Sequence, residues 1–307
     1  MNGSRPLAAR CKALIARAAI LREIRRFFTE EGYLEVETPL RIPSLAPEAH
    51  IDAIQSDGWL LQTSPEICMK RMLAAGYERL FQICHCWRAD ERGKKHLPEF
   101  TMLEWYRVGV DYRQMMTDCE NLVRGLAASL GLADTICYQK TSIELTGEWE
   151  RLTVREAFTR YGGLSMEEAL AREMFDEIMV RDIEPLLGLE KPTFICDYPA
   201  ERSALARLKP EDPSVAERFE LYIGGVELAN AFSELTNPVE QRRRFVAEAA
   251  CREKQRRPAY PLPEPFLNEL SAMPPSAGIA LGVDRLVMVL IDALCIDEVV
   301  AFTPEEL

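Results

Sequence analysis

The chain is 307 residues long, 48% hydrophobic and 28% charged, which is the composition of a globular enzyme that can bury a substantial core. No apolar run approaches the roughly 18 residues of a membrane-spanning helix, and the net charge of −12 disfavours a nucleic acid bound across a whole face. The nine cysteines are scattered and odd in number, so we expect reduced thiols and a cytoplasmic protein without membrane attachment.

The first half of the chain contains three predicted amphipathic helices. Hydrophobic periodicity predicts helices over residues 13–31 and 115–130, each ending at a glycine, and a shorter helix over residues 67–75. Residues 33–38 alternate between apolar and polar side chains and end at a proline, which predicts a strand at the edge or end of a sheet. Residues 134–190 have weak, acidic periodicity, and we interpret them as a mainly helical insertion.

The second half of the chain alternates strands with helices. Strands are predicted at residues 193–196 and 276–283, and residues 223–235 are predicted to form a strand pair or one bent strand. A helix is predicted from Asn237, which suits an N-cap and precedes a proline, to about Arg256. Because the strands do not follow a regular βαβ alternation, the pattern favours a mixed, mainly antiparallel sheet in an α+β fold.

The most informative segment begins at Arg88 and is predicted to be a hairpin with a charged loop. An apolar strand of residues 80–87 precedes Arg88, and a second strand opens with Pro98 and Phe100. The basic loop between them could close over a polyphosphate, because the planar fork of an arginine can hold two oxygens at once. An ordinary hairpin with a solvated loop is the alternative when this segment is considered alone.

Two acidic residues, Glu227 and Glu234, form a second candidate site. They are an odd number of residues apart, so they would face opposite sides of one regular strand. Either one of them faces solvent, or the chain bends near Asn230 and Ala231 and both reach a common site. Two carboxylates together with ATP oxygens would suit Mg²⁺. The chain has no glycine-rich phosphate loop, so an ATP site would have to use side chains and metal ions.

A third candidate is the glycine-containing segment from Gly278 to Leu286. Its small residues would let a ligand approach the strand closely, and Arg285 lies at the mouth of a predicted helix. The guanidinium could cover one face of an adenine while Phe100 covers the other. A strand–turn–helix corner with a surface arginine is the alternative.

A fourth candidate, Ser64-Pro65-Glu66, precedes the helix predicted at residues 67–75. Glu66 could pair with the ammonium group of a substrate. It could equally complement the positive end of that helix, which is an ordinary structural role.

Together these segments resemble the three motifs of a class II aminoacyl-tRNA synthetase of the lysine type. The first motif runs from Gly32 to Pro39, the second from Arg88 to Thr101 and the third from Gly282 to Arg285. The resemblance covers most of the chain. It implies a single catalytic domain over residues 1–307, with the insertion at about 134–190, built on a six- to seven-stranded, mainly antiparallel sheet flanked by helices. It also implies a homodimer formed partly through the first motif.

The resemblance is closest to a tRNA-free group within that family, the ligases that attach (R)-β-lysine to a lysine of elongation factor P. The run from Phe100 to Tyr106 resembles that group. Ala280 stands where lysyl-tRNA synthetases commonly have glycine, so its methyl group would reshape the pocket floor toward a β-amino acid. The core helix starts almost at the first residue, so no N-terminal anticodon-binding domain is expected. We therefore expect an ATP- and Mg²⁺-dependent ligase that adenylates a lysine-like amino acid and modifies elongation factor P, with no tRNA partner.

The resemblance also implies roles for the site residues. Arg88, Glu227 and Arg285 would be catalytic: Arg88 would bridge the substrate carboxylate and the α-phosphate, and Glu227 would hold Mg²⁺. Glu234 would share that ion or read a substrate ammonium group. The ATP site would consist of Arg88, Asp90, Glu91, His96, Phe100, Glu227, Leu228, Asn230, Gly282 and Arg285. The amino-acid pocket would consist of Ser64, Pro65, Glu66, Tyr106, Glu234 and Ala280.

Two alternatives stay open. The first is a truncated lysyl-tRNA synthetase-like enzyme that charges a tRNA or another carrier. The second is a regulatory module that binds an amino acid without turnover, although a pure sensor would not need Arg88, the two acids and Arg285 together. Asp90 is one methylene shorter than the glutamate usual in the second motif, so the adenine contact could pass to Glu91 or to water.

Overall fold

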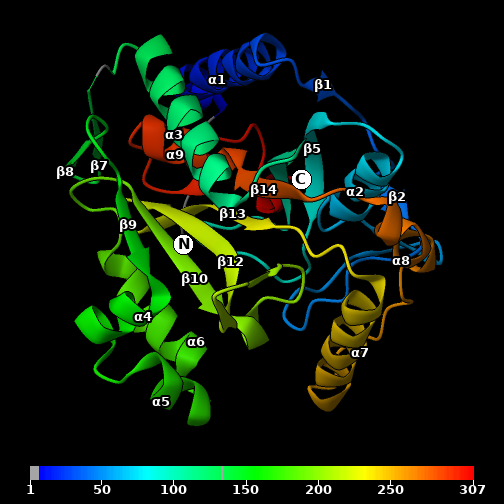
Figure 1. The fold of residues 1–307 in the computed structure, drawn as a ribbon. Helices are drawn as coiled ribbons and strands as arrows, with labels where there is room; N and C mark the ends of the chain where they lie inside the picture. The colour runs from blue at the N-terminus through cyan, green and yellow to red at the C-terminus, as the bar shows by residue number, and fades with distance from the viewer. Residues whose placement is uncertain (1–6, 133) are drawn as a thin grey trace.

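A large β-sheet forms the centre of the computed structural model, which describes residues 7–132 and 134–307 (Figure 1). Its strands are β1 (Leu34–Glu35), β5 (Arg79–Trp87), β6 (Glu99–Val108), β9 (Glu150–Thr153), β10 (Thr193–Pro199), β11 (Leu208–Lys209), β12 (Asp212–Ile223), β13 (Val226–Ser233) and β14 (Ser276–Gly282). The strand order is β1-β5-β6-β14-β13-β12-β10-β9, and β11 pairs with β12. The six long strands are antiparallel, whereas the short strands β1 and β9 pair in parallel at the two edges. The predicted α+β fold is confirmed.

Two small sheets lie outside the central one. The first has the order β2-β4-β3 and consists of β2 (Arg41–Ile42), β3 (Gln55–Ser56) and β4 (Trp59–Leu61). The second is a hairpin of β7 (Thr135–Tyr138) and β8 (Thr141–Glu144).

The main hydrophobic core lies between one face of the central sheet and three helices, which Figure 1 shows together at the upper side of the molecule. These are α1 (Cys11–Glu30), α3 (Tyr112–Ser129) and α9 (Val283–Leu290). Ile20, Ile24 and Phe28 of α1 are fully buried, which agrees with the predicted amphipathic pattern. Asp111 caps α3 by accepting hydrogen bonds from the next turn of backbone.

A second core packs three further helices near β5 and β6. These are α2 (Glu66–Ala74), α7 (Pro238–Lys254) and α8 (Glu264–Glu269). Asn237 caps α7 as predicted, because its side-chain oxygen accepts the backbone N–H groups of Val239 and Glu240 at 3.0 and 3.1 Å. None of the helices in the described ranges combines the length and the apolar character needed to span a membrane.

The stretch from residue 134 to residue 190 begins with strands and continues with short helices. After β7, β8 and β9, it contains α4 (Val154–Ala157), η2 (Phe158–Gly162), α5 (Met166–Ala171), α6 (Phe175–Ile178), η3 (Met179–Ile183) and η4 (Glu184–Leu186). These helices bury a separate cluster of apolar side chains against β10 and β12, in which the rings of Phe158 and Phe175 stack at 5.0 Å. The other short helices are η1 (Leu7–Arg10), η5 (Ala200–Arg202), η6 (Leu270–Ala272), η7 (Ile296–Glu298) and η8 (Pro304–Glu306).

Two predicted strands differ from the structure in a way that has a physical explanation. The edge strand expected at residues 33–38 is reduced to two exposed residues, because β1 has a single neighbour and a proline soon follows. The segment 223–235 contains one strand, β13, which carries a bulge, because β12 already ends at Ile223 and β13 begins after a tight turn. Gly224 and Gly225 form that turn with φ of 62° and 68°, values that favour glycine.

Candidate active site

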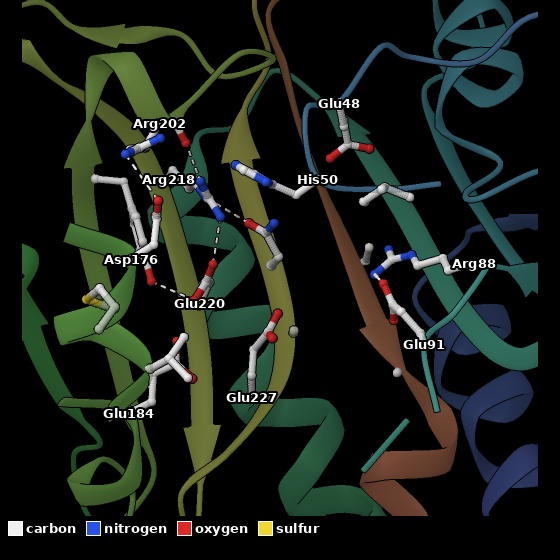
Figure 2. Close-up of a pocket in the computed structure, with 18 of the residues that line it drawn as sticks. Glu48, His50, Arg88, Glu91, Asp176, Glu184, Arg202, Arg218, Glu220 and Glu227 are labelled. Atoms are coloured by element: carbon white, nitrogen blue, oxygen red, sulfur yellow. Dashed lines mark hydrogen bonds and ion pairs between the residues drawn. The ribbon is translucent and has the colours of Figure 1, made fainter. Parts of the chain in front are cut away.

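A cavity of about 580 Å³ opens on the side of the sheet that lies away from the main core (Figure 2). Its walls come from the β5–β6 hairpin, from β12, β13 and β14, from residues 48–51 and from α6. Ten of the predicted site residues line it: Arg88, Glu91, His96, Phe100, Glu227, Leu228, Asn230, Ala280, Gly282 and Arg285. These ten residues come from three distant segments of the chain, 88–100, 227–230 and 280–285, which converge on one space.

Arg88 lies at the mouth of the β5–β6 hairpin with its guanidinium largely free. Its backbone N–H donates to the carbonyl of Pro98 at 2.9 Å, which closes the hairpin. Its guanidinium lies 5.2 Å from the ring centre of Phe100, and its nearest ion-pair distance to Glu91 is 3.9 Å. The Nε group is buried and has no hydrogen-bond partner among the described residues. An anion that entered here would satisfy a donor that is otherwise unpaired.

A β-bulge aims Glu227 into the cavity. The pairing of β12 with β13 is regular at Leu221 and Ala229 but then shifts, so that Tyr222 lies opposite Glu227. Leu228 is the extra residue, and it places Glu227 on the same face as Asn230. The irregularity predicted near Asn230 and Ala231 exists, but it lies at Leu228.

The opposite wall carries a polar network that the sequence analysis missed. Arg218 donates to Asn230 at 3.1 Å and to Glu220 at 2.6 Å, and its guanidinium lies 4.3 Å from the ring centre of Tyr198. Tyr198 and Tyr222 both donate to the second oxygen of Glu220, at 2.6 and 2.9 Å. Burial raises the pKa of Glu220, whereas the charge of Arg218 opposes that shift. The alternation of Arg218, Glu220 and Tyr222 along an otherwise apolar strand was the available sequence signal.

A second bulge orients Tyr198 toward this network. The pairing of β10 with β12 shifts between Cys196 and Tyr198, and the intervening Asp197 has a φ of 60°. Tyr112 and Lys209 both donate to the carboxylate of Asp197, at 2.9 and 2.6 Å, and these bonds hold the unusual backbone in place.

Three carboxylates gather on the same wall: those of Glu184, Glu220 and Glu227 (Figure 2). Burial and repulsion from Glu220 and Glu227 raise the pKa of Glu184 to about 7. In the described part of the chain no three histidine, cysteine or acidic side chains are grouped closely enough to hold a metal by themselves. A cation on this wall would therefore need oxygens from a bound substrate as well.

Arg285 fastens the loop of the β5–β6 hairpin over the cavity. It donates to the carbonyl of Glu227 at 2.9 Å and to the carbonyl of Lys95 at 3.1 Å, and it lies 2.5 Å from Nε2 of His96. Burial and the charge of Arg285 lower the pKa of His96, so this imidazole is a neutral acceptor. Lys95 in turn donates to the carbonyl of Gly225 at 2.7 Å.

A buried polar cluster lies next to Met102 and Ala280 of the cavity lining and includes Glu104, a second residue missed from the sequence. The predicted pocket residues Glu66, Tyr106 and Glu234 belong to this cluster and do not line the cavity. Its carboxylate accepts hydrogen bonds from Ser64 and Tyr106, each at 3.0 Å. Burial and the neighbouring Glu66 raise the pKa of Glu104 well above its ordinary value. Glu104 and Tyr106 share one face of β6, while Leu103 and Trp105 face the main core, so the alternation of the strand was its signal.

Lys70, also missed, is enclosed by the acids of this cluster. It forms ion pairs with Glu66 and, at 2.5 Å, with Glu234, and it lies 4.9 Å from the ring centre of Phe232. Burial alone would lower the pKa of Lys70, but Glu234 and Glu66 outweigh it and raise the pKa above its ordinary value. Burial raises the pKa of Glu234 to about 8, although Lys70 opposes that shift.

The predicted magnesium pair of Glu227 and Glu234 is wrong. These residues lie at opposite ends of β13, and at the rise of an extended strand about 20 Å separates their backbones. Glu234 is moreover 2% exposed and held by Lys70. Glu220 on the neighbouring strand is the carboxylate that shares a wall with Glu227, because the bulge at Leu228 turns Glu227 to the face on which Glu220 lies.

Other predicted residues lie away from the cavity. Asp90 is exposed with a φ of 63° and does not line the cavity, whereas its neighbour Glu91 does. Pro65 is buried at the start of α2, and Ser64 accepts the backbone N–H of Glu66 at 3.0 Å. Pro65 and Ser64 therefore organise the beginning of this helix, and Ser64 also contacts Glu104.

Gly278 is predicted to be essential to the packing of this cluster. A Cβ atom at this position would lie 2.2 Å from Cε1 of Tyr106 and 2.7 Å from Oε1 of Glu234. We expect Gly278→Ala to lower the free energy of unfolding by about 1–3 kcal/mol, measured by urea denaturation, because a packed core must shift to accept the methyl group. The control is Gly282→Ala, whose Cβ would lie 3.7 Å from its nearest neighbour, an ordinary contact. Equal stability of the two variants would contradict this view of the packing.

Comparison with known proteins agrees with this geometry. The family model described as tRNA synthetases class II (D, K and N) matches residues 8–306. A protein from Erwinia tasmaniensis named elongation factor P–(R)-β-lysine ligase is 40% identical, with 94% of each chain covered. Proteins of the same name from Salmonella typhi and Salmonella gallinarum are each 38% identical, again over 94% of each chain. The chain therefore belongs to the class II tRNA synthetases of the aspartate, lysine and asparagine type.

Proposed function

We propose that this protein is an ATP-dependent ligase that adenylates a lysine-type amino acid, (R)-β-lysine, and transfers it to a lysine side chain of elongation factor P. The observation that carries the proposal is the convergence of an arginine with an unpaired Nε and a wall of carboxylates on one cavity. The relatives with that name, which match over nearly the whole chain, support the acceptor and the amino acid.

The nucleotide binds between the β5–β6 hairpin and β13 in this proposal. Arg88 contacts the α-phosphate and the carboxylate of the amino acid, and it stabilises the charge that accumulates as the two react. Phe100 and Arg285 lie on the cavity wall where they can pack against the adenine ring. Glu91 makes the contact with adenine that was expected of Asp90, because Glu91 lines the cavity and Asp90 does not.

The carboxylate wall fits Mg²⁺, which prefers one or two protein carboxylates together with phosphate oxygens and water. Glu220 and Glu227 supply these carboxylates, and repulsion between the acids of this wall is relieved when a cation binds. The ion would neutralise charge on the phosphates, and the protein residues hold and orient the reactants.

The buried cluster supplies the specificity for a basic amino acid. Glu104 accepts a hydrogen bond from Tyr106 on the strand next to Ala280, and Glu66 and Glu234 form ion pairs with Lys70 in the same cluster. Ala280 lines the cavity between this cluster and the nucleotide region, so its methyl group would contact the reacting end of the amino acid.

The proposal also includes a homodimer in the cytoplasm. Light scattering after gel filtration measures the mass of the particle and so tests the dimer.

One experiment tests the proposal and separates it from its alternatives. ATP–pyrophosphate exchange is measured with α-lysine and with (R)-β-lysine, followed by transfer to elongation factor P or to tRNA. We expect exchange to be faster with (R)-β-lysine and transfer to occur only to the protein. Transfer to tRNA would favour a truncated synthetase, and the absence of exchange with any amino acid would favour a binding module.

Glu227→Gln tests the metal site. The amide keeps the shape of the side chain but removes its charge, so we expect the Mg²⁺ concentration for half-maximal exchange to rise by about tenfold or more. The control is Glu201→Gln, an exposed acid on the rim of the same cavity. An unchanged Mg²⁺ dependence in Glu227→Gln would remove this residue from the metal site.

A further inference from the structure

Residues 48–52 form a loop at the cavity that a buried arginine holds rigidly. Arg252 of α7 is fully buried and donates to the carbonyls of Glu48 and Ile51 at 2.8 and 2.7 Å. It also donates to the carboxylate of Asp52 at 2.6 Å. The backbone N–H of Ala49 donates to Glu248 of the same helix at 2.8 Å. The backbone that follows the Glu48 side chain is therefore fixed.

The Glu48 carboxylate, in contrast, is uncommitted. Its side chain lines the cavity and makes no hydrogen bond or ion pair with any residue that the structure describes. Figure 2 shows it on the same side of the cavity as Arg88 and across from Glu220 and Glu227. It is close enough to Arg88 for the two charges to interact. A fixed backbone that carries a free carboxylate beside the phosphate-binding arginine is a preorganised acceptor of a proton or a cation.

We propose that Glu48 is the general base of the transfer step, an inference that rests on the proposed ligase function. The nitrogen of the acceptor amine attacks the carbonyl carbon of the aminoacyl adenylate, and an N–C bond forms. The bond between that carbon and the phosphate oxygen breaks, and its electron pair leaves with AMP. The proton lost by the nitrogen passes to the carboxylate of Glu48, from which it returns to solvent through the open cavity.

The electrostatic surroundings suit this role at neutral pH. Burial and the neighbouring Glu66 raise the pKa of Glu48 to about 7, with a further contribution from Glu248, while Arg88 and Arg218 act in the opposite direction. A base whose pKa lies near the pH of the reaction is partly deprotonated and is still basic enough to accept the proton. Because only the carboxylate form accepts a proton, the transfer rate is expected to rise with pH through about 7.

The test compares Glu48→Gln with the wild-type protein in three assays. The first is ATP–pyrophosphate exchange, and the second is capture of the preformed adenylate by hydroxylamine, which is already neutral and strongly nucleophilic. The third is single-turnover transfer from the adenylate to elongation factor P and to n-butylamine. We expect exchange and capture by hydroxylamine to be unchanged and transfer to both amines to be about 100-fold slower. Free amine increases about tenfold per pH unit near pH 7 in both experiments. The rate of Glu48→Gln should follow this increase alone, without the additional inflection near pH 7 that the wild-type protein shows.

The outcomes distinguish this inference from the function on which it rests. Absence of exchange in the wild-type protein would overturn the ligase function itself. Normal exchange with equal transfer rates in both proteins would overturn the role of Glu48 alone. A parallel loss of exchange and transfer would also overturn it, since Glu48 would then bind the amino acid or the adenylate. Glu201→Gln, on the rim of the same cavity, is the matched control and is expected to behave as wild type in all assays.

Discussion

Arg88→Ala is expected to slow ATP–pyrophosphate exchange by about 10²–10³-fold, since one preorganised donor at a developing charge contributes this much to a rate. The guanidinium of Arg88 has its Nε unpaired and lies against Phe100, so the folded chain depends on it little. We therefore expect the free energy of unfolding to change far less than the exchange rate. Arg88→Lys should recover part of the activity, because it restores the charge without the planar fork.

The control for Arg88 is Lys94→Ala, an exposed cation in the same loop. Its side chain does not line the cavity, so exchange should remain close to that of the wild-type protein. If both variants lost activity equally, the effect would belong to the net charge of the loop. If Arg88→Ala exchanged normally, Arg88 would have no role in activation.

Lys70→Met is expected to lower the free energy of unfolding by about 3–5 kcal/mol, measured by urea denaturation, because it leaves acids buried without their cation. The side chains of Lys70 and Glu234 are 1% and 0% exposed, so solvent cannot replace the lost partner. Methionine is similar in length to lysine, so the change in packing should contribute little to the loss of stability. The second variant, Lys70→Met with Glu234→Gln, should recover part of the loss since one of the unpaired charges is then absent.

The matched control for Lys70 is its neighbour Arg71. Arg71 pairs with Glu269 at 2.7 Å, but both side chains are about two-fifths exposed. Arg71→Met should therefore cost less than about 1 kcal/mol. Comparable losses for the two variants would mean that the Lys70 cluster is more hydrated than the structure indicates.

Local signals account for the parts of the fold and site that were predicted from the sequence. The cap at Asn237 and the hairpin that starts at Arg88 depend on neighbours in the chain, and the structure contains both. The third motif, ending at Arg285, likewise follows from a strand that leads directly into a helix. The family resemblance then predicted that segments distant in the sequence form one site, and most of the predicted nucleotide-binding residues line one cavity.

The misses share a different cause, which is dependence on contacts between segments that are far apart in the sequence. Whether Glu227 joins Glu220 or Glu234 is decided by a bulge at Leu228, and that bulge is defined only by the pairing of β13 with β12. Lys70 belongs to a helix whose buried face is set by the sheet, so periodicity alone could not show that its ammonium group lies among acids. The position of Glu48 at the cavity depends on Arg252, which lies some 200 positions away in the chain.

The attachment of the β5–β6 loop has a thermodynamic consequence for nucleotide binding. Lys95 and Arg285 already fix this loop to the turn at Gly225 and to the start of α9, and the backbone N–H of Ile296 donates to the carbonyl of Lys94 at 2.8 Å. A loop that is ordered before the ligand arrives loses little conformational entropy on association. Because contacts within the protein hold this loop, the contacts made by the phosphates would contribute mainly to affinity.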